Sequence, residues 1–140
     1  MKSGFGIIEV MIALAMLMVC ALAAFRTIQV CMHAAHYSET MSRAAVLCRT
    51  QAASLWAEPQ ASPALSPGWH KDPANPIIEG GMTFYRFWSV QEAELGLRTR
   101  VYVAWSEKGR AASCEFDSEE EAEASVQPKV TMSGLIPSWP

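Results

Sequence analysis

Sixteen consecutive residues near the start of this 140-residue chain, Val10 to Phe25, carry no polar side chain. A run of this length approaches the roughly 20 apolar residues that an α-helix needs to cross the hydrocarbon core of a bilayer. No helix-breaking residue follows it soon, because glycine and proline are absent from Ile7 to Glu58. The sequence therefore predicts one helix from Phe5 to Ala57, about 80 Å long, of which only about 30 Å is needed to cross the membrane.

The second half of this helix has a different pattern. Beyond Arg26 the apolar residues recur mostly at intervals of three and four, which is typical of a helix that buries one stripe. The stripe comprises Ile28, Cys31, Met32, Ala35, Met41, Ala44, Ala45, Cys48, Ala52 and Leu55. We predict a membrane-spanning half over residues 5–25 and a half outside the membrane over residues 26–58, which packs on the rest of the chain.

Prolines end the helix and dominate the next segment. Five of them lie between Glu58 and Ile77, so a proline-rich loop is predicted over residues 59–80. Trp69 lies inside this loop. It either fills the gap between the loop and the domain, which we favour, or anchors a partner.

Residues 81–140 carry the strand signals. Met82 to Val90 is rich in aromatic and β-branched residues on both of its faces, and Leu97 to Ser106 alternates cleanly. A short third strand is predicted at Ala112, Cys114 and Phe116. A fourth is predicted at Val126, Val130 and Met132, where Pro128 indicates an edge position. The fold class predicted is α+β, with the long helix packed through Met41–Leu55 on the face of a small antiparallel sheet that bears Val101, Val103 and Trp105.

Polar clusters and cysteines give no firm site. The segment Asp117–Glu123 has five carboxylates, and we expect a solvated acidic loop rather than a calcium site. His33 and His36 share a helix face, but solvent exposure is expected rather than metal binding. Cys31 and Cys48 would lie about 25 Å apart on one helix, too far to bridge. Cys114 is left to pair with either of them, or all four thiols, Cys20 included, are free.

Charge and motif content exclude several functions. A net charge of −3 provides no basic surface for nucleic acid. The sequence has no glycine-rich nucleotide motif and no nucleophile with a base at a supporting spacing. We therefore expect a structural protein without catalysis, cofactor or metal.

Three interpretations of the N-terminus compete. A cleaved secretory signal would end near Ala21–Ala23, a lipoprotein signal would end at Cys20, and a retained helix would stay in the membrane. Glu9 argues against the first, because a carboxylate in an apolar span is costly and a passive signal peptide has no use for it. Val19 argues against the second, since a small residue normally precedes a lipidated cysteine. The retained helix is favoured.

The segment Gly4-Phe5-Gly6-Ile7-Ile8-Glu9-Val10, followed by the apolar run, resembles the leader of type IV prepilins. The resemblance implies that residues 1–4 are a leader, that a prepilin peptidase cuts between Gly4 and Phe5, and that the same enzyme N-methylates Phe5. It also places Glu9 at the acidic position that acts in assembly. Gly6 departs from the commoner Thr or Ser at that position.

The predicted sheet segments are similar, more loosely, to those of small minor pseudopilins of type II secretion. This likeness implies a subunit that initiates or caps a short periplasmic pseudopilus. Its expected partners are the lipid bilayer, other pseudopilins or pilins, the prepilin peptidase and an inner-membrane assembly platform. The chain would then cross the bacterial inner membrane once, with its C-terminal domain in the periplasm. A minor pilin of a type IV pilus and a membrane-anchored periplasmic binding module are the alternatives.

Overall fold

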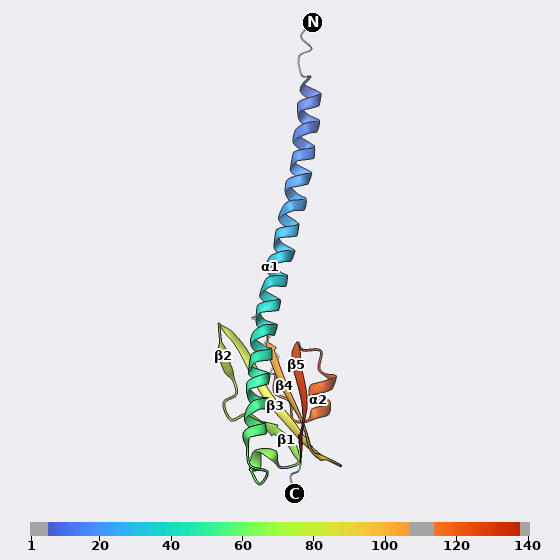
Figure 1. Cartoon of the computed structure of the whole chain (residues 1–140). Helices are drawn as coiled ribbons and strands as arrows, with labels where there is room; N and C mark the ends of the chain where they lie inside the picture. The colour runs from blue at the N-terminus through green and yellow to red at the C-terminus, as the bar shows by residue number, and fades with distance from the viewer. Residues whose placement is uncertain (1–5, 107–113, 138–140) are drawn as a thin grey trace. The chain divides into compact units, whose positions relative to one another are not determined.

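Helix α1 is the longest element of the chain and spans Ile7–Ala57 (Figure 1). A computed structural model describes residues 6–106 and 114–137. The chain divides into two compact units, Met1–Glu39 and Thr40–Pro140, and α1 contributes to both. The helix is continuous because neither glycine nor proline interrupts it, as the sequence predicts.

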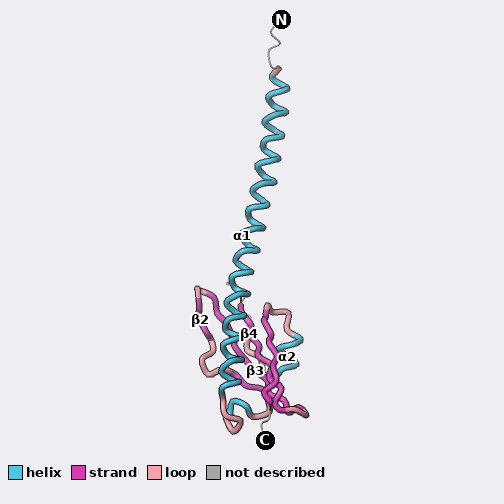
Figure 2. The backbone as a smooth tube through the Cα atoms, in the orientation of Figure 1, coloured by secondary structure: helices cyan, strands magenta, loops and turns pink. Residues whose placement is uncertain are grey.

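The second unit contains a five-stranded antiparallel sheet beside the C-terminal part of α1 (Figure 2). Its strands are β1 (Gly68–Lys71), β2 (Ile77–Glu79), β3 (Met82–Ala93), β4 (Gly96–Ser106) and β5 (Lys129–Pro137). The order is β1-β3-β4-β5, and β2 pairs with the same side of β3 as β1 does. Strands β3 and β4 form a long hairpin from Thr83↔Ser106 to Ala93↔Gly96.

One face of the sheet packs against α1 and forms the main core. The helix contributes Ala44, Cys48 and Leu55 to this core. The sheet contributes Phe84, Trp88, Val90, Val101, Val103, Trp105 and Ile136. The predicted α+β fold is therefore confirmed, and the part of the stripe from Ala44 to Leu55 packs on Val101, Val103 and Trp105 as predicted. The earlier part of the stripe is not packed as predicted: Ile28, Cys31, Met32 and Ala35 are exposed. Met41 is half exposed, and Thr40 is buried one position earlier.

The opposite face of the sheet is also covered. Trp69 of β1 stacks on Phe87 with ring centroids 5.5 Å apart, and its indole N–H donates to the Phe116 carbonyl at 3.1 Å. Ala122 of the short helix α2 (Glu119–Ala124) completes this second cluster with Tyr102. The favoured interpretation of Trp69, as a residue that fills the gap between the proline-rich segment and the domain, is confirmed.

The prediction of a plain loop over residues 59–80 is wrong. This segment holds a 3₁₀ turn at Pro63–Leu65 and the two short strands β1 and β2. Between these strands the Asn75 side-chain amide takes the place of a backbone partner. It accepts from the Arg86 N–H and donates to the Arg86 carbonyl, both at 2.8 Å. The Arg86 Nε–H also donates to Asp72 at 2.5 Å. These side-chain bonds hold the proline-rich segment along the edge of β3 between β1 and β2.

The last part of the chain needs three further corrections. Ala112 lies outside the described residues, while Cys114 and Phe116 are buried but form no strand. Residues predicted as an acidic loop form α2. Val126 is fully exposed and lies before β5, which begins at Lys129. The predicted edge position of this last strand is confirmed.

Candidate functional site

The predicted assembly residue Glu9 lies in the first turn of α1. The helix begins beside Gly6, whose carbonyl accepts from the N–H groups of Glu9 at 2.9 Å and Val10 at 3.3 Å. A carboxylate in this turn is favoured by the positive end of the helix dipole. Glu9 is exposed in the single chain and is the only acidic residue before Glu39, so its charge is available to another molecule.

The part of α1 that follows Glu9 is solvent-exposed in the single chain. Large apolar side chains such as Leu14 and Leu17 are 62% and 68% exposed. Among the described residues, α1 is the one helix long and apolar enough to cross a membrane. Length and composition alone also fit a signal sequence. The described residues therefore contain one membrane-span candidate, near the N-terminus, and its first turn carries a carboxylate.

The other two predicted residues, Gly4 and Phe5, lie outside the described residues. Their proposed cleavage and methylation stay predictions from the sequence. Of the three predicted residues, the structure describes only Glu9, which lies in the first turn of α1.

The four cysteines are free thiols. Cys48 is buried in the core between α1 and the sheet, and its thiol donates to the Val101 carbonyl at 3.5 Å. Burial raises the pKa of Cys48 to about 11, so the thiol stays protonated. Cys114 belongs to the cluster on the other face of the sheet. The alternative of a Cys48–Cys114 disulfide is therefore wrong, because the sheet lies between the two sulfurs.

His33 and His36 are exposed on α1, as expected. Across residues 6–106 and 114–137, no three His, Cys, Asp or Glu side chains come close enough to hold a metal ion.

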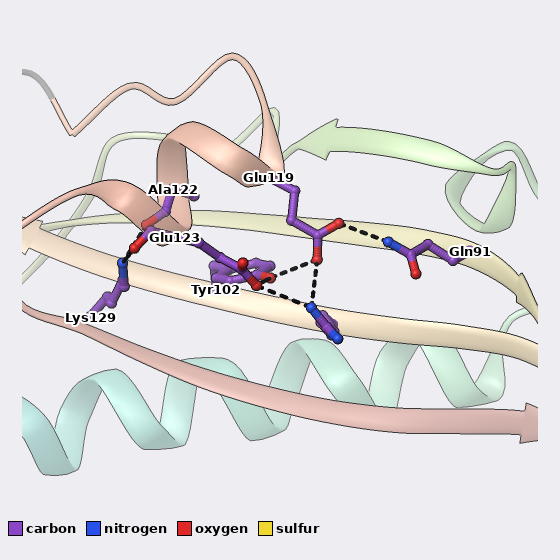
Figure 3. Close-up of polar contacts among 7 residues, drawn as sticks. Gln91, Tyr102, Glu119, Ala122, Glu123 and Lys129 are labelled. Atoms are coloured by element: carbon purple, nitrogen blue, oxygen red, sulfur yellow. Dashed lines mark hydrogen bonds and ion pairs between the residues drawn. The ribbon is translucent and has the colours of Figure 1, made fainter.

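A polar network that the sequence analysis missed holds α2 on the sheet (Figure 3). The Tyr102 hydroxyl donates to Glu119 at 2.7 Å and lies 3.2 Å from Glu123. Arg100 bridges the same two carboxylates at 3.2 and 3.1 Å. Gln91 donates to Glu119 at 3.0 Å. The network thus satisfies two acids of the segment with donors from β3 and β4.

Both ends of α2 are capped. At the start, Ser118 accepts from the Glu121 N–H at 3.2 Å, and the Glu121 carboxylate accepts from the Asp117 N–H at 2.9 Å. At the end, the Lys129 ammonium donates to the Glu123 carbonyl at 2.8 Å and to the Ala122 carbonyl. The Ser-x-x-Glu spacing at 118–121 is the sequence signal that indicates such a helix start.

The network shifts the pKa values of its members, and the Tyr102 hydrogen bond and the two carboxylates raise that of Arg100. Burial and the bond to Glu119 raise the pKa of Tyr102, which stays neutral. Burial alone would raise the pKa of Glu119, but the Tyr102 hydrogen bond and the Arg100 charge outweigh it and lower that pKa. A neutral phenol and a fixed carboxylate suit a structural contact, since neither is poised to transfer a proton near neutral pH.

No protein family, curated protein or solved structure matches this chain.

The lowered pKa of Glu119 makes the stability of the domain depend on pH. A carboxyl whose folded pKa lies below its ordinary value of 4.5 stabilises the fold above that value, and the contribution is lost as the pH falls through the folded pKa. Glu119→Gln should therefore lower the free energy of unfolding by about 1 kcal/mol at pH 7, a modest value because solvent reaches the site. Below pH 4.5 its difference from wild type should shrink. Denaturant titrations at several pH values measure this, with exposed Glu120→Gln as the control. Equal loss in the two variants at pH 7 would contradict the role of Glu119.

Proposed function

We propose that the chain is a minor pseudopilin, a structural subunit that initiates or caps a short periplasmic pseudopilus for type II protein secretion. The observation that carries the proposal is Glu9, a lone carboxylate in the first turn of an uninterrupted helix and directly ahead of 16 residues without a polar side chain. Keeping a carboxylate there costs free energy in a membrane, so it requires a function.

That function would be pairing between subunits. Cleavage after Gly4 would free the amine of Phe5, four residues before Glu9. A free ammonium and a lone carboxylate are each costly in an apolar setting, and pairing across neighbouring subunits offsets both costs. Such a polar contact also fixes the axial offset of one helix against the next, as buried polar residues fix register in coiled coils.

The arrangement of the rest of the chain supports the same role. The α1 segment from Thr40 to Ala57 is built into the core of the second unit, so a force on the helix is transmitted to the folded domain. In the proposed setting the apolar half lies in the bacterial inner membrane and the domain lies in the periplasm. The prepilin peptidase, an assembly platform and other pseudopilins are the partners this requires.

Processing at the leader is the first test. Protein purified from its own host should have a mass that lacks Met1–Gly4 and includes one additional methyl group, which tandem mass spectrometry should place on Phe5. Glycine at the cut lets the peptidase approach the backbone closely. Gly4→Val should therefore accumulate as the full-length chain. A retained Met1–Gly4 in wild type would favour a membrane-anchored binding module, and a mass that starts at Ala24 would indicate an ordinary signal peptide.

Glu9 itself is the second test. If it pairs between subunits, Glu9→Leu should be cleaved and inserted normally but lose most in vivo cross-linking to partner pseudopilins. If it pairs only with Phe5 of its own chain, cross-linking should continue. Gln29→Leu, which also replaces a polar side chain with leucine at an exposed position of the same helix, is the control and should cross-link as wild type does. Co-purification of partners with Glu9→Leu at wild-type yield would rule out the intersubunit role.

A further inference from the structure

Strand β5 forms one edge of the sheet, and its pairing with β4 shows which backbone groups face outward. β5 pairs with β4 without interruption from Lys129 to Pro137. Trp105 N–H donates to the Pro128 carbonyl at 3.3 Å, which places the even-numbered residues of this strand in the hydrogen-bonded positions. Because these positions alternate in an antiparallel pair, the N–H and C=O groups of Thr131, Ser133 and Leu135 point away from β4. All three residues are exposed.

The usual protections of an edge strand are missing from this stretch. Natural edges carry a lysine, an internal proline or a bulge, or are very short. Residues 130–136 contain no charged residue and no proline, and their register has no bulge. The one nearby lysine, Lys129, is held by the carbonyls at the end of α2. Within the described chain, no other strand pairs with this edge.

An exposed aromatic ring lies beside the open edge. Trp56, near the end of α1, is 60% exposed. Its indole covers Gly134, where an added Cβ would lie 3.1 Å from the ring. A side chain on a neighbouring strand next to Gly134 would therefore meet the free part of the indole. Leu135, on the other face of the same strand, is 43% exposed.

The geometry points to the outer edge of β5 as a site where an extended segment of another polypeptide adds as a further strand, with an apolar side chain packed on Trp56. The open N–H and C=O groups define the occupant as an extended backbone, because main-chain hydrogen bonds supply the affinity in strand addition. The absence of charge along residues 130–136 means that the added segment is recognised by an apolar side chain and not by ion pairs. The open edge itself does not depend on the proposed function, but the choice of another polypeptide over a second copy rests on it.

A second copy of this chain suits the edge poorly. Two identical edges that pair antiparallel are related by a two-fold axis, so the two β5 strands run in opposite directions. The two Thr40–Ala57 helix segments would then also run in opposite directions. In the proposed function all subunits share one orientation relative to the membrane, which two opposed helix segments do not suit. A partner with a free extended segment has no such restriction.

The test uses the full chain in detergent and a synthetic probe. The probe is a capped eight-residue peptide of alternating threonine and valine with one phenylalanine. At saturation, amide hydrogen exchange at Thr131, Ser133 and Leu135 should slow by about tenfold, while Val130 and Met132, already bonded to β4, should change little. Peptides N-methylated on the residues of one side should lose binding, and peptides methylated on the opposite side should keep it.

Protein variants distinguish strand pairing from nonspecific hydrophobic binding. Ser133→Pro removes one outward N–H without touching the β4 ladder and should abolish protection, whereas Ser133→Ala should bind as wild type does. Trp56→Ala and replacement of the peptide's phenylalanine by alanine should each weaken binding about threefold, with no further loss when combined.

Four results would overturn the inference. They are unchanged exchange at residues 131, 133 and 135, equal binding of the two methylated peptide series, slow exchange of these amides before the peptide is added, and a sedimenting dimer that protects the same amides. The third result would show that the chain covers its own edge, and the fourth would identify a second copy as the occupant.

Discussion

The second unit depends on close contact between α1 and the sheet, and this contact rests on complementary side-chain size. Ala44 and Cys48 of the helix are fully buried and small, while Phe84 and Trp105 opposite them are fully buried and large. The small helix residues let the helix backbone approach the strands, and the aromatic rings fill the remaining space. The Cys48 thiol also donates to the Val101 carbonyl at this contact. A larger residue at Ala44 or Cys48 would push the helix away from the whole strand pair β3–β4.

The same helix has two different environments along its length. No side chain from Gly6 to Glu39 is buried in the single chain, whereas from Thr40 onward one residue in every turn or two is buried. The first part must therefore find another apolar environment, which a bilayer or neighbouring helices provide. Glu9 is a charged residue in the first turn of that part. The exposed part of α1 and the open edge of β5 are the features on which the proposed contacts with other chains rest.

The sequence predicted the elements that rest on local signals. The helix followed from the missing glycine and proline, and β4 followed from its alternation. The strands β1 and β2 were missed because prolines dominate their surroundings, and because the pairing at Arg86 comes from the side chain of Asn75. Helix α2 was missed although Ser118 and Glu121 show the spacing of a helix start. The network of Tyr102 and Glu119 forms between β4 and α2, which are separate segments of the sequence. No local sequence pattern therefore predicts it. Among the predicted site residues, Glu9 lies in the first turn of α1 in the structure, while Gly4 and Phe5 lie outside the described residues.

The most direct measurement of the division of α1 is the solvent accessibility of nitroxide labels in bilayers. The labels are placed singly at Leu14 and at Val46, in a variant whose exposed Cys20 and Cys31 are serine; Cys48 and Cys114 are buried and should not react. Oxygen, which concentrates in lipid, should relax the Leu14 label far more than an aqueous nickel chelate does. The Val46 label should show the reverse. Strong relaxation by the chelate at both positions would contradict a helix that is half in the membrane and half in the folded domain.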